Sequence, residues 1–361
     1  MTGFRSIRPV AHMGAAVFVL SLSAFAARCG SASEPAPTPA PASAPDASYP
    51  AIPRYEAMHV PPDNPMSPAK VELGRQLYYD TRLSGDGKRS CYSCHVEERG
   101  LTDGQPLAIG AFDRTLTRSS PTMWNIGYHS QWYWDGRATT LEAQAKAAWS
   151  GGNMGANGKD GPSMDQICAT LNGIEGYRSQ FQAVFGAACT QDNVPQALAA
   201  FMRTIVSTDS PWIRYREGDQ SALSEAARRG HQLFDGKAQC GRCHSGALLT
   251  DLQFHNVGVG MDAKAPDLGR FTVTKEDRDR GAFKTPTLID VSRSAPYFHN
   301  GSAATLEAAV DQMLAGGIAN PWLDKANLQP VTLTKEERED LLQFLRELTA
   351  RYTITAPTLP R

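Results

Sequence analysis

The chain has 361 residues, which is long enough for two or three domains that each bury a core of their own. Its 36 basic and 37 acidic side chains leave a net charge of -1. This balance excludes a strongly basic protein, so we expect no nucleic-acid partner and no polybasic membrane anchor.

The N-terminus predicts an export signal over residues 1–28. Arg5 and Arg8 precede an apolar stretch over residues 13–27. That stretch has the length of a signal peptide and is short for a helix that spans a bilayer. We therefore expect the mature protein in the periplasm or the cell envelope.

The segment that follows predicts a tether. Residues 24–26 (Ala-Phe-Ala) suit an ordinary signal peptidase, whereas Cys29 suits attachment of a lipid anchor, and the sequence leaves both open. Residues 29–50 are rich in Pro, Ala and Ser. Such a segment cannot bury enough apolar surface to offset its ordering entropy, so it is predicted to be a linker.

Two short cysteine motifs carry the chemistry, "SCYSCH" at 90–95 and "CGRCH" at 240–244. In Cys-x-x-Cys-His the two thiols can form thioethers to one haem while the histidine ligates its iron. A zinc knuckle would need four closely grouped ligands, and a dithiol redox pair would leave the histidine without a role. Two covalently bound haem c groups are predicted, held by Cys91, Cys94 and His95 and by Cys240, Cys243 and His244.

The surroundings of the two motifs repeat as well. "LGRQLYYD" at 73–80 precedes the first motif, and "RGHQLFDG" at 229–236 precedes the second. Two similar units imply two similar domains. We therefore predict two cytochrome c-like domains, one over 51–208 and one over 209–355.

The fold class is predicted to be all-α. Apolar residues at helical spacing indicate helices over 194–206 and 334–348, and the second begins with Thr334 and Glu337 in capping-box spacing. Long Gly-rich stretches such as 151–161 are expected to be loops.

Two cysteines remain outside the motifs and the signal region, Cys168 and Cys189. An exported protein can form a disulfide between them, and the other interpretation is two separate buried thiols.

Several longer phrases resemble those of the bacterial di-haem cytochrome c peroxidases and their MauG-type relatives. The phrases follow the family's order and extend over roughly residues 50 to 350. They lie at 80–95, 133–145, 254–259, 267–274 and 283–313.

The resemblance implies an enzyme that reduces hydrogen peroxide to water with electrons from a small cytochrome or copper protein. One alternative is a MauG-like enzyme that oxidises Tyr or Trp side chains of a partner protein. Another is a di-haem electron carrier without catalysis. Members of the family often dimerise, so a homodimer is also among the expected partners.

The resemblance also implies roles for four further residues. Met313 would be the second ligand of the electron-transfer haem, although Met313 also continues an apolar helical stripe and Met261 is an alternative. Trp134 would relay electrons between the haems, whereas a tryptophan beside other aromatic residues is more often packing. Gln144 and Arg137 would lie at the open face of the first haem, or would be a surface amide and a loop ion pair.

One departure from the family's pattern concerns the ligands of the first haem. Ala111 stands where many members have a histidine that caps this haem, so we expect an open iron. His129 remains as a substitute ligand or, on the simpler interpretation, as a structural histidine.

Two further departures affect the proton supply and a calcium ion. Met154 replaces the family's acid-base glutamate, so Asp135, Glu142 or water would have to supply the proton. Ser119 replaces the asparagine that binds calcium between the domains, which leaves calcium without support.

Overall fold

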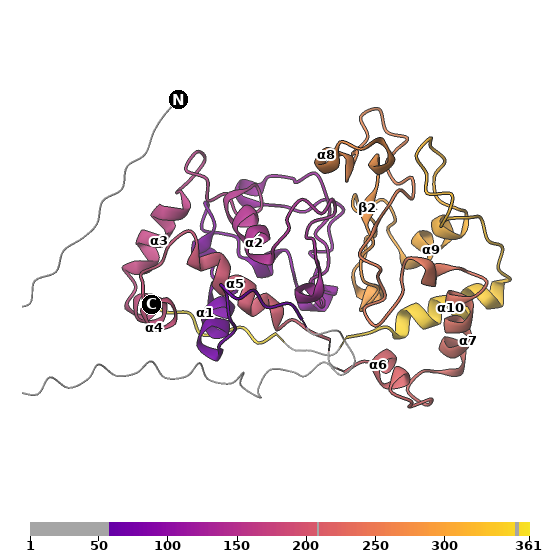
Figure 1. The fold of residues 1–361 in the computed structure, drawn as a ribbon, viewed down its shortest axis with the longest axis horizontal. Helices are drawn as coiled ribbons and strands as arrows, with labels where there is room; N and C mark the ends of the chain where they lie inside the picture. The colour runs from indigo at the N-terminus through magenta and orange to yellow at the C-terminus, as the bar shows by residue number, and fades with distance from the viewer. Residues whose placement is uncertain (1–57, 208, 351–353) are drawn as a thin grey trace, which may run out of the picture. The chain divides into compact units, whose positions relative to one another are not determined.

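The computed structural model describes residues 58–207, 209–350 and 354–361, which all belong to one compact unit (Figure 1). The predicted signal peptide and linker, with Cys29, lie outside the described residues, as does residue 208 at the predicted domain boundary. Within the described part of the chain, no helix has the length and apolar character needed to cross a membrane.

The predicted helical fold is confirmed. The α-helices are α1 (Pro68–Tyr79), α2 (Leu141–Ser150), α3 (Met164–Asn172), α4 (Glu175–Phe185), α5 (Asn193–Arg203), α6 (Pro211–Arg216), α7 (Glu225–Asp235), α8 (Phe271–Thr274), α9 (Leu306–Leu314) and α10 (Lys335–Glu347). Short 3-10 helices are η1 (Thr81–Leu83), η2 (Cys91–Ser93), η3 (Glu97–Arg99), η4 (Ala111–Asp113), η5 (Ile126–Tyr128), η6 (Cys240–Arg242), η7 (Asp277–Asp279) and η8 (Val291–Arg293). Two strands, β1 (Phe254–His255) and β2 (Phe283–Lys284), pair in antiparallel orientation.

Polar caps explain where the helices begin. Ser67, Ser224 and Thr305 each accept a hydrogen bond from a backbone N–H group in the first turn of α1, α7 and α9. Before α10, Thr334 and Glu337 form the predicted capping box, because each side chain accepts a hydrogen bond from the other's backbone N–H group.

The internal repeat appears as two helix crossings, α1 on α5 and α7 on α10. A Cβ atom on Gly74 would lie 1.9 Å from the carbonyl oxygen of Ala197, and one on Gly230 would lie 2.0 Å from that of Asp340. Only glycine lets the backbones approach this closely. The repeated glycine therefore fixes the same crossing in both halves.

The same crossings place equivalent aromatic pairs. Tyr78 contacts Phe201 with ring centroids 5.1 Å apart and an interplanar angle of 61°. Phe234 contacts Phe344 at 5.2 Å and 68°. Both are edge-to-face contacts within the core.

A second repeated block precedes α2 and α9. An isolated bridge pairs Trp132 with Ala138 before α2, and another pairs Tyr297 with Ala303 before α9. Each helix then begins after a capping threonine, Thr140 or Thr305. The two blocks keep one constant offset in numbering, so each position of α2 from Leu141 to Trp149 has a counterpart in α9.

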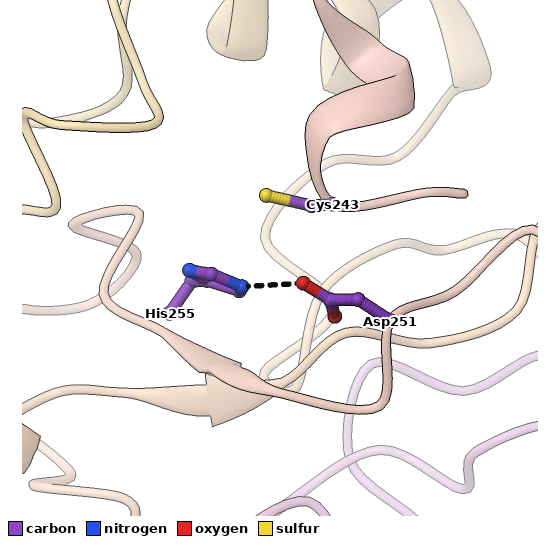
Figure 2. Close-up of side chains that lie close together, drawn as sticks. All are labelled: Cys243, Asp251 and His255. Atoms are coloured by element: carbon purple, nitrogen blue, oxygen red, sulfur yellow. Dashed lines mark hydrogen bonds and ion pairs between the residues drawn. The ribbon is translucent and has the colours of Figure 1, made fainter.

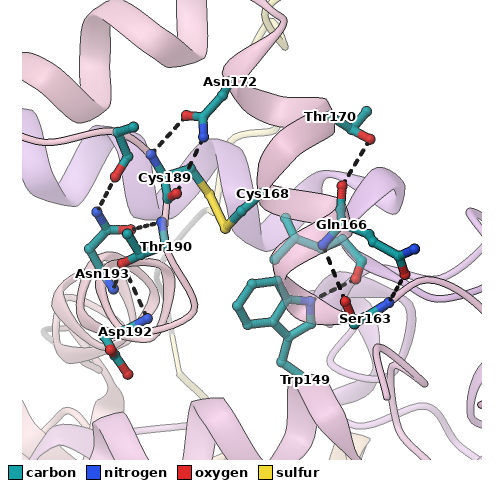
Figure 3. The surroundings of a disulfide bond; sticks show 12 residues. Trp149, Ser163, Gln166, Cys168, Thr170, Asn172, Cys189, Thr190, Asp192 and Asn193 are labelled. Carbon is teal, nitrogen blue, oxygen red and sulfur yellow. Dashed lines mark hydrogen bonds between the residues drawn. A yellow bond between two sulfur atoms is a disulfide. The ribbon is translucent and has the colours of Figure 1, made fainter. Parts of the chain in front are cut away.

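The predicted disulfide between Cys168 and Cys189 is confirmed (Figure 3). Asn172 holds the chain at Cys189, because its side chain accepts from the Cys189 N–H group at 2.8 Å and donates to the Cys189 carbonyl oxygen at 3.3 Å. The two cysteines are 21 residues apart in sequence. Closing a loop of that length stabilises the folded state by roughly 3 kcal/mol on the chain-entropy model.

The C-terminal residues 354–361 return to the first half of the chain. The Tyr79 hydroxyl donates to the carbonyl oxygen of Ile354 at 3.0 Å, and Arg82 donates to that of Pro360 at 2.9 Å. In Figure 1 the C-terminus accordingly lies beside α4. The end of the chain thus contacts the first half and not only the second.

Candidate functional site

Each cysteine motif opens onto its own cavity. Cys91, Cys94 and His95 line a cavity of about 560 Å³ in the first half. Cys240, Cys243 and His244 line a cavity of about 260 Å³ in the second half. We call these the first cavity and the second cavity.

The two motif histidines are prepared as metal ligands in the same way. Nδ1 of His95 lies 3.0 Å from the carbonyl oxygen of Leu101, and Nδ1 of His244 lies 3.1 Å from that of Leu249. A carbonyl can only accept, so Nδ1 carries the proton and Nε2 keeps the lone pair that a metal needs. Burial lowers the pKa of both histidines, which favours the neutral form that binds iron.

The backbone that presents these carbonyl groups is unusual in both halves. Leu101 has φ of 61° and Leu249 has φ of 52°, a region that leucine rarely adopts. The strained turn therefore recurs with the histidine contact, which supports one shared design for the two sites.

The motif thiols fit haem attachment better than zinc. Burial raises the pKa of Cys91 to about 12, that of Cys94 to about 11 and that of Cys240 to about 12. Zinc needs four closely grouped ligands, whereas each motif supplies two thiols and one histidine. The walls of the first cavity are also rich in apolar side chains: Leu83, Leu116, Ile126, Leu198 and Met202. The donor set and the apolar walls suit a haem.

A cluster beside the second cavity resembles a metal site but does not fit one (Figure 2). Ligand atoms of Cys243, Asp251 and His255 lie within 4.8 Å of one another. However, His255 contacts Asp251 through Nε2 at 2.9 Å and Asp324 through Nδ1 at 2.6 Å. Hydrogen bonding to Cys243 and to the two carboxylates raises the pKa of His255 to about 10. An imidazolium has no lone pair for a metal.

The side chain at one position of the repeated helix differs between the two cavities. Met313 lines the second cavity, whereas the alternative Met261 does not. By the constant offset between α2 and α9, the counterpart of Met313 is Ala148, which lines the first cavity. A thioether can ligate iron and a methyl group cannot. Sequence reasoning missed Ala148, although the repeat of 135–149 at 300–314 contains the signal.

Ala111 is buried but is not part of the wall of the first cavity. Its methyl group faces Gly155, 3.0 Å from where a Cβ atom on that glycine would lie. Residues 114–118 of the same loop line the cavity instead.

His129 lines the first cavity, but one of its nitrogens is already engaged. Its Nδ1 lies 3.1 Å from Nζ of the buried Lys284, which also donates to the carbonyl oxygen of Gln131 at 2.8 Å. Burial, and secondarily the charge of Lys284, keep the pKa of His129 well below its usual value. Its Nε2 is buried and has no hydrogen-bond partner, so the contacts leave both interpretations of His129 open.

Gln144 and Arg137 both line the first cavity, as the resemblance implies. Gln144 lies one turn before Ala148 on α2, and its backbone carbonyl oxygen accepts from the Tyr133 hydroxyl at 3.1 Å. Arg137 stacks on the Tyr133 ring, with Cζ 3.5 Å from the centroid, and pairs with Asp135 at 3.0 Å. Tyr133 thus holds both residues at the wall of the cavity.

Trp134 lines both cavities. Its Nε1 donates to the carbonyl oxygen of Ser119 at 3.0 Å, and its own backbone carbonyl oxygen accepts from the backbone N–H group of Lys284 at 2.8 Å. The indole is therefore held in place between the two motif sites.

The two candidate proton donors, Asp135 and Glu142, differ in whether they line the first cavity. Met154 and Asp135 line the first cavity, whereas Glu142 does not. Glu142 pairs instead with Arg203 at 2.7 Å. Asp135 is therefore the one carboxylate of the two candidates at the cavity wall, where it pairs with Arg118 at 2.7 Å.

Ser119 uses its hydroxyl for a protein contact, since it donates to the carbonyl oxygen of Phe298 at 2.9 Å. The neighbouring Arg118 binds Asp267 as well as Asp135, both at 2.7 Å. These carboxylates thus already have a cationic partner.

Comparison with known proteins agrees with this site. The family model for di-haem cytochrome c peroxidase matches residues 68–221. The methylamine utilization protein MauG of Methylorubrum extorquens is 38% identical over 312 residues, covering 85% of this chain and 86% of MauG. The cytochrome-c peroxidase IdrP1 of Denitromonas iodatirespirans is 38% identical over 343 residues, covering 86% and 89%.

A solved structure agrees as well. The crystal structure of a MauG-like protein associated with microbial copper homeostasis superposes with a TM-score of 0.76 at 33% identity, covering 85% of this chain and 97% of that one. The fold and the matches define a di-haem oxidoreductase of the peroxidase type. The chain belongs to the di-haem cytochrome c peroxidase family, which includes MauG.

Proposed function

We propose that this protein reduces hydrogen peroxide to water with electrons from a small cytochrome or copper protein. One observation carries the proposal: at the same position of a repeated helix, the second cavity has Met313 and the first has Ala148. A haem with two strong ligands can only pass electrons, whereas a haem with an open face can bind peroxide.

The residues divide into two haem sites. Cys91, Cys94 and His95 would hold the first haem c, and Cys240, Cys243, His244 and Met313 would hold the second. When bound, the haems would supply the redox chemistry that cleaves the O–O bond. The proposal includes no calcium ion, because the carboxylates beside Ser119 are paired with Arg118.

The protein's own part at the first cavity is orientation and proton supply. The Gln144 amide and the Arg137 guanidinium would donate hydrogen bonds to peroxide, and the Tyr133 ring restricts the motion of the guanidinium. Asp135 or water would deliver the proton, since the side chain of Met154 cannot.

Trp134 would carry electrons from the second site to the first. It is the aromatic side chain that lines both cavities and is fixed by hydrogen bonds at its ring and backbone. The proposed location is the periplasm or the cell envelope, which rests on the predicted signal peptide and on Cys29 as a candidate for lipidation.

Stopped-flow mixing of the reduced holoprotein with peroxide tests this function. We expect the absorption bands to show that both haems are oxidised within one turnover, because Trp134 connects the two sites. We also expect reduced cytochrome c to be consumed in step with peroxide. Reversible reduction with no peroxide-dependent rate would instead indicate an electron carrier. Peroxide-dependent modification of a partner protein, without turnover of cytochrome, would indicate the MauG-like activity.

A further inference from the structure

We propose that three tyrosines of the first half form a path that moves oxidising equivalents from the first haem site to a surface oxidation site at Tyr92. This inference rests on the proposed function, because peroxide is its oxidant. The surface site would take electrons from small phenols.

The three rings form a continuous cluster that begins at the first cavity. Tyr78 is fully buried and lines the cavity. Its ring centroid lies 5.6 Å from that of Tyr79 and 6.5 Å from that of Tyr92. Tyr79 and Tyr92 are stacked at 4.6 Å. Electrons transfer readily between aromatic rings at van der Waals contact, so the cluster can carry a charge outward.

Tyr92 is placed to connect the haem site with solvent. It lies between Cys91 and Cys94, the two cysteines of the first motif, and it is only half-buried. Its hydroxyl points to the exposed Glu98, whose Oε2 lies 3.4 Å away. The path therefore ends at a side chain that an external donor can reach.

The hydroxyl partners indicate where an oxidised tyrosine would rest. A phenol is oxidised easily only if its proton has an acceptor. The Tyr78 hydroxyl contacts the carbonyl oxygen of His95 and the sulfur of Met123, and the Tyr79 hydroxyl contacts the carbonyl oxygen of Ile354. Those atoms are weak bases, whereas the Glu98 carboxylate beside Tyr92 can accept a proton.

The electrons and protons balance in this scheme. One peroxide takes two electrons and two protons to give two waters. Tyr92 supplies one electron inward through the cluster and passes its phenol proton to Glu98, which releases it to solvent. Asp135 or water supplies the matching proton to peroxide at the first cavity. A small phenol then returns an electron and a proton to Tyr92, and a second round completes the reduction.

The second half shows that packing alone does not require these tyrosines. By the internal repeat, Tyr78, Tyr79 and Tyr92 correspond to Phe234, Asp235 and Gly241. Asp235 and Gly241 are neighbours there, since a Cβ atom on Gly241 would lie 2.5 Å from Oδ1 of Asp235. The same helix crossing thus forms in the second half although none of the three equivalent positions is a tyrosine. The oxidisable residues occur in the half proposed to react with peroxide.

Freeze-quench EPR of the full-length holoprotein, mixed with hydrogen peroxide, tests the path. We expect a tyrosyl radical in the wild type, identified by its narrowing when the protein contains ring-deuterated tyrosine. Tyr92→Phe is expected to lose this signal and to lose peroxide-dependent oxidation of the phenol guaiacol. The control is Tyr215→Phe, since Tyr215 also stacks on an aromatic ring, that of Trp212, but lies in the second half. It is expected to keep both.

Haem content and the ferric spectrum show whether Tyr92→Phe has folded and loaded its haems. An unchanged tyrosyl signal and unchanged guaiacol oxidation in a loaded Tyr92→Phe protein would overturn the path. Turnover of peroxide and cytochrome c by the wild type without any tyrosyl signal would also overturn it, while leaving the proposed function intact. Failure of peroxide to oxidise either haem would overturn both.

Discussion

Ala148→Met is expected to convert the first haem from high-spin to low-spin and to slow its reaction with peroxide by about 100-fold, a loss of about 2.7 kcal/mol of transition-state stabilisation. The reason is that α2 and α9 are equivalent helices of the internal repeat, so Ala148 has the position in α2 that Met313 has in α9. The new thioether would occupy the face that peroxide needs.

The control for this variant is Ala147→Met. Ala147 is the preceding residue of α2 and is exposed, so a methionine there tests the effect of the added side chain without a new ligand. Ferric EPR and the rate of haem oxidation by peroxide measure both variants. If Ala148→Met leaves the high-spin signal and the rate unchanged, the two helices do not present equivalent positions to their haems.

Met313→Ala is expected to lower the reduction potential of the second haem by at least roughly 0.1 V, since axial ligands set haem potentials over a range of about 0.8 V. Loss of the thioether removes the ligand that stabilises the ferrous state. The second haem would then also show a high-spin ferric signal. Spectroelectrochemical titration of the two haem bands measures the change.

Met261→Ala serves as the matched control. Met261 was the other candidate ligand from the sequence, but it does not line the second cavity. We expect its replacement to leave the potential of the second haem unchanged. An unchanged potential in Met313→Ala, or a lowered one in Met261→Ala, would show that Met313 is not the ligand.

The helices and the motif sites could be predicted because their signals are local. Apolar spacing together with Thr334 and Glu337 places α10 without any tertiary information. The two cysteine motifs and the repeated glycine also indicate two similar halves, and the structure shows why: Gly74 and Gly230 allow the same helix crossing.

The positions of loop residues could not be predicted from spacing. The resemblance gives Ala111 the position of a histidine ligand, and only the structure shows that the loop turns at Phe112, which has φ of 59°, and that Ala111 faces Gly155 and does not line the cavity. Likewise, Glu142 and Asp135 are equally plausible proton donors in the sequence. The ion pair with Arg203 keeps Glu142 away from the cavity, which only the tertiary structure shows.

The most direct test of the central claim, one open site and one closed by sulfur, is EPR of the wild-type holoprotein with both haems ferric. We predict a high-spin signal from the haem on His95 and a low-spin signal from the haem on His244 and Met313, in equal amounts. Two low-spin signals without a high-spin component would contradict the account, because the first iron would then have a strong ligand on both faces.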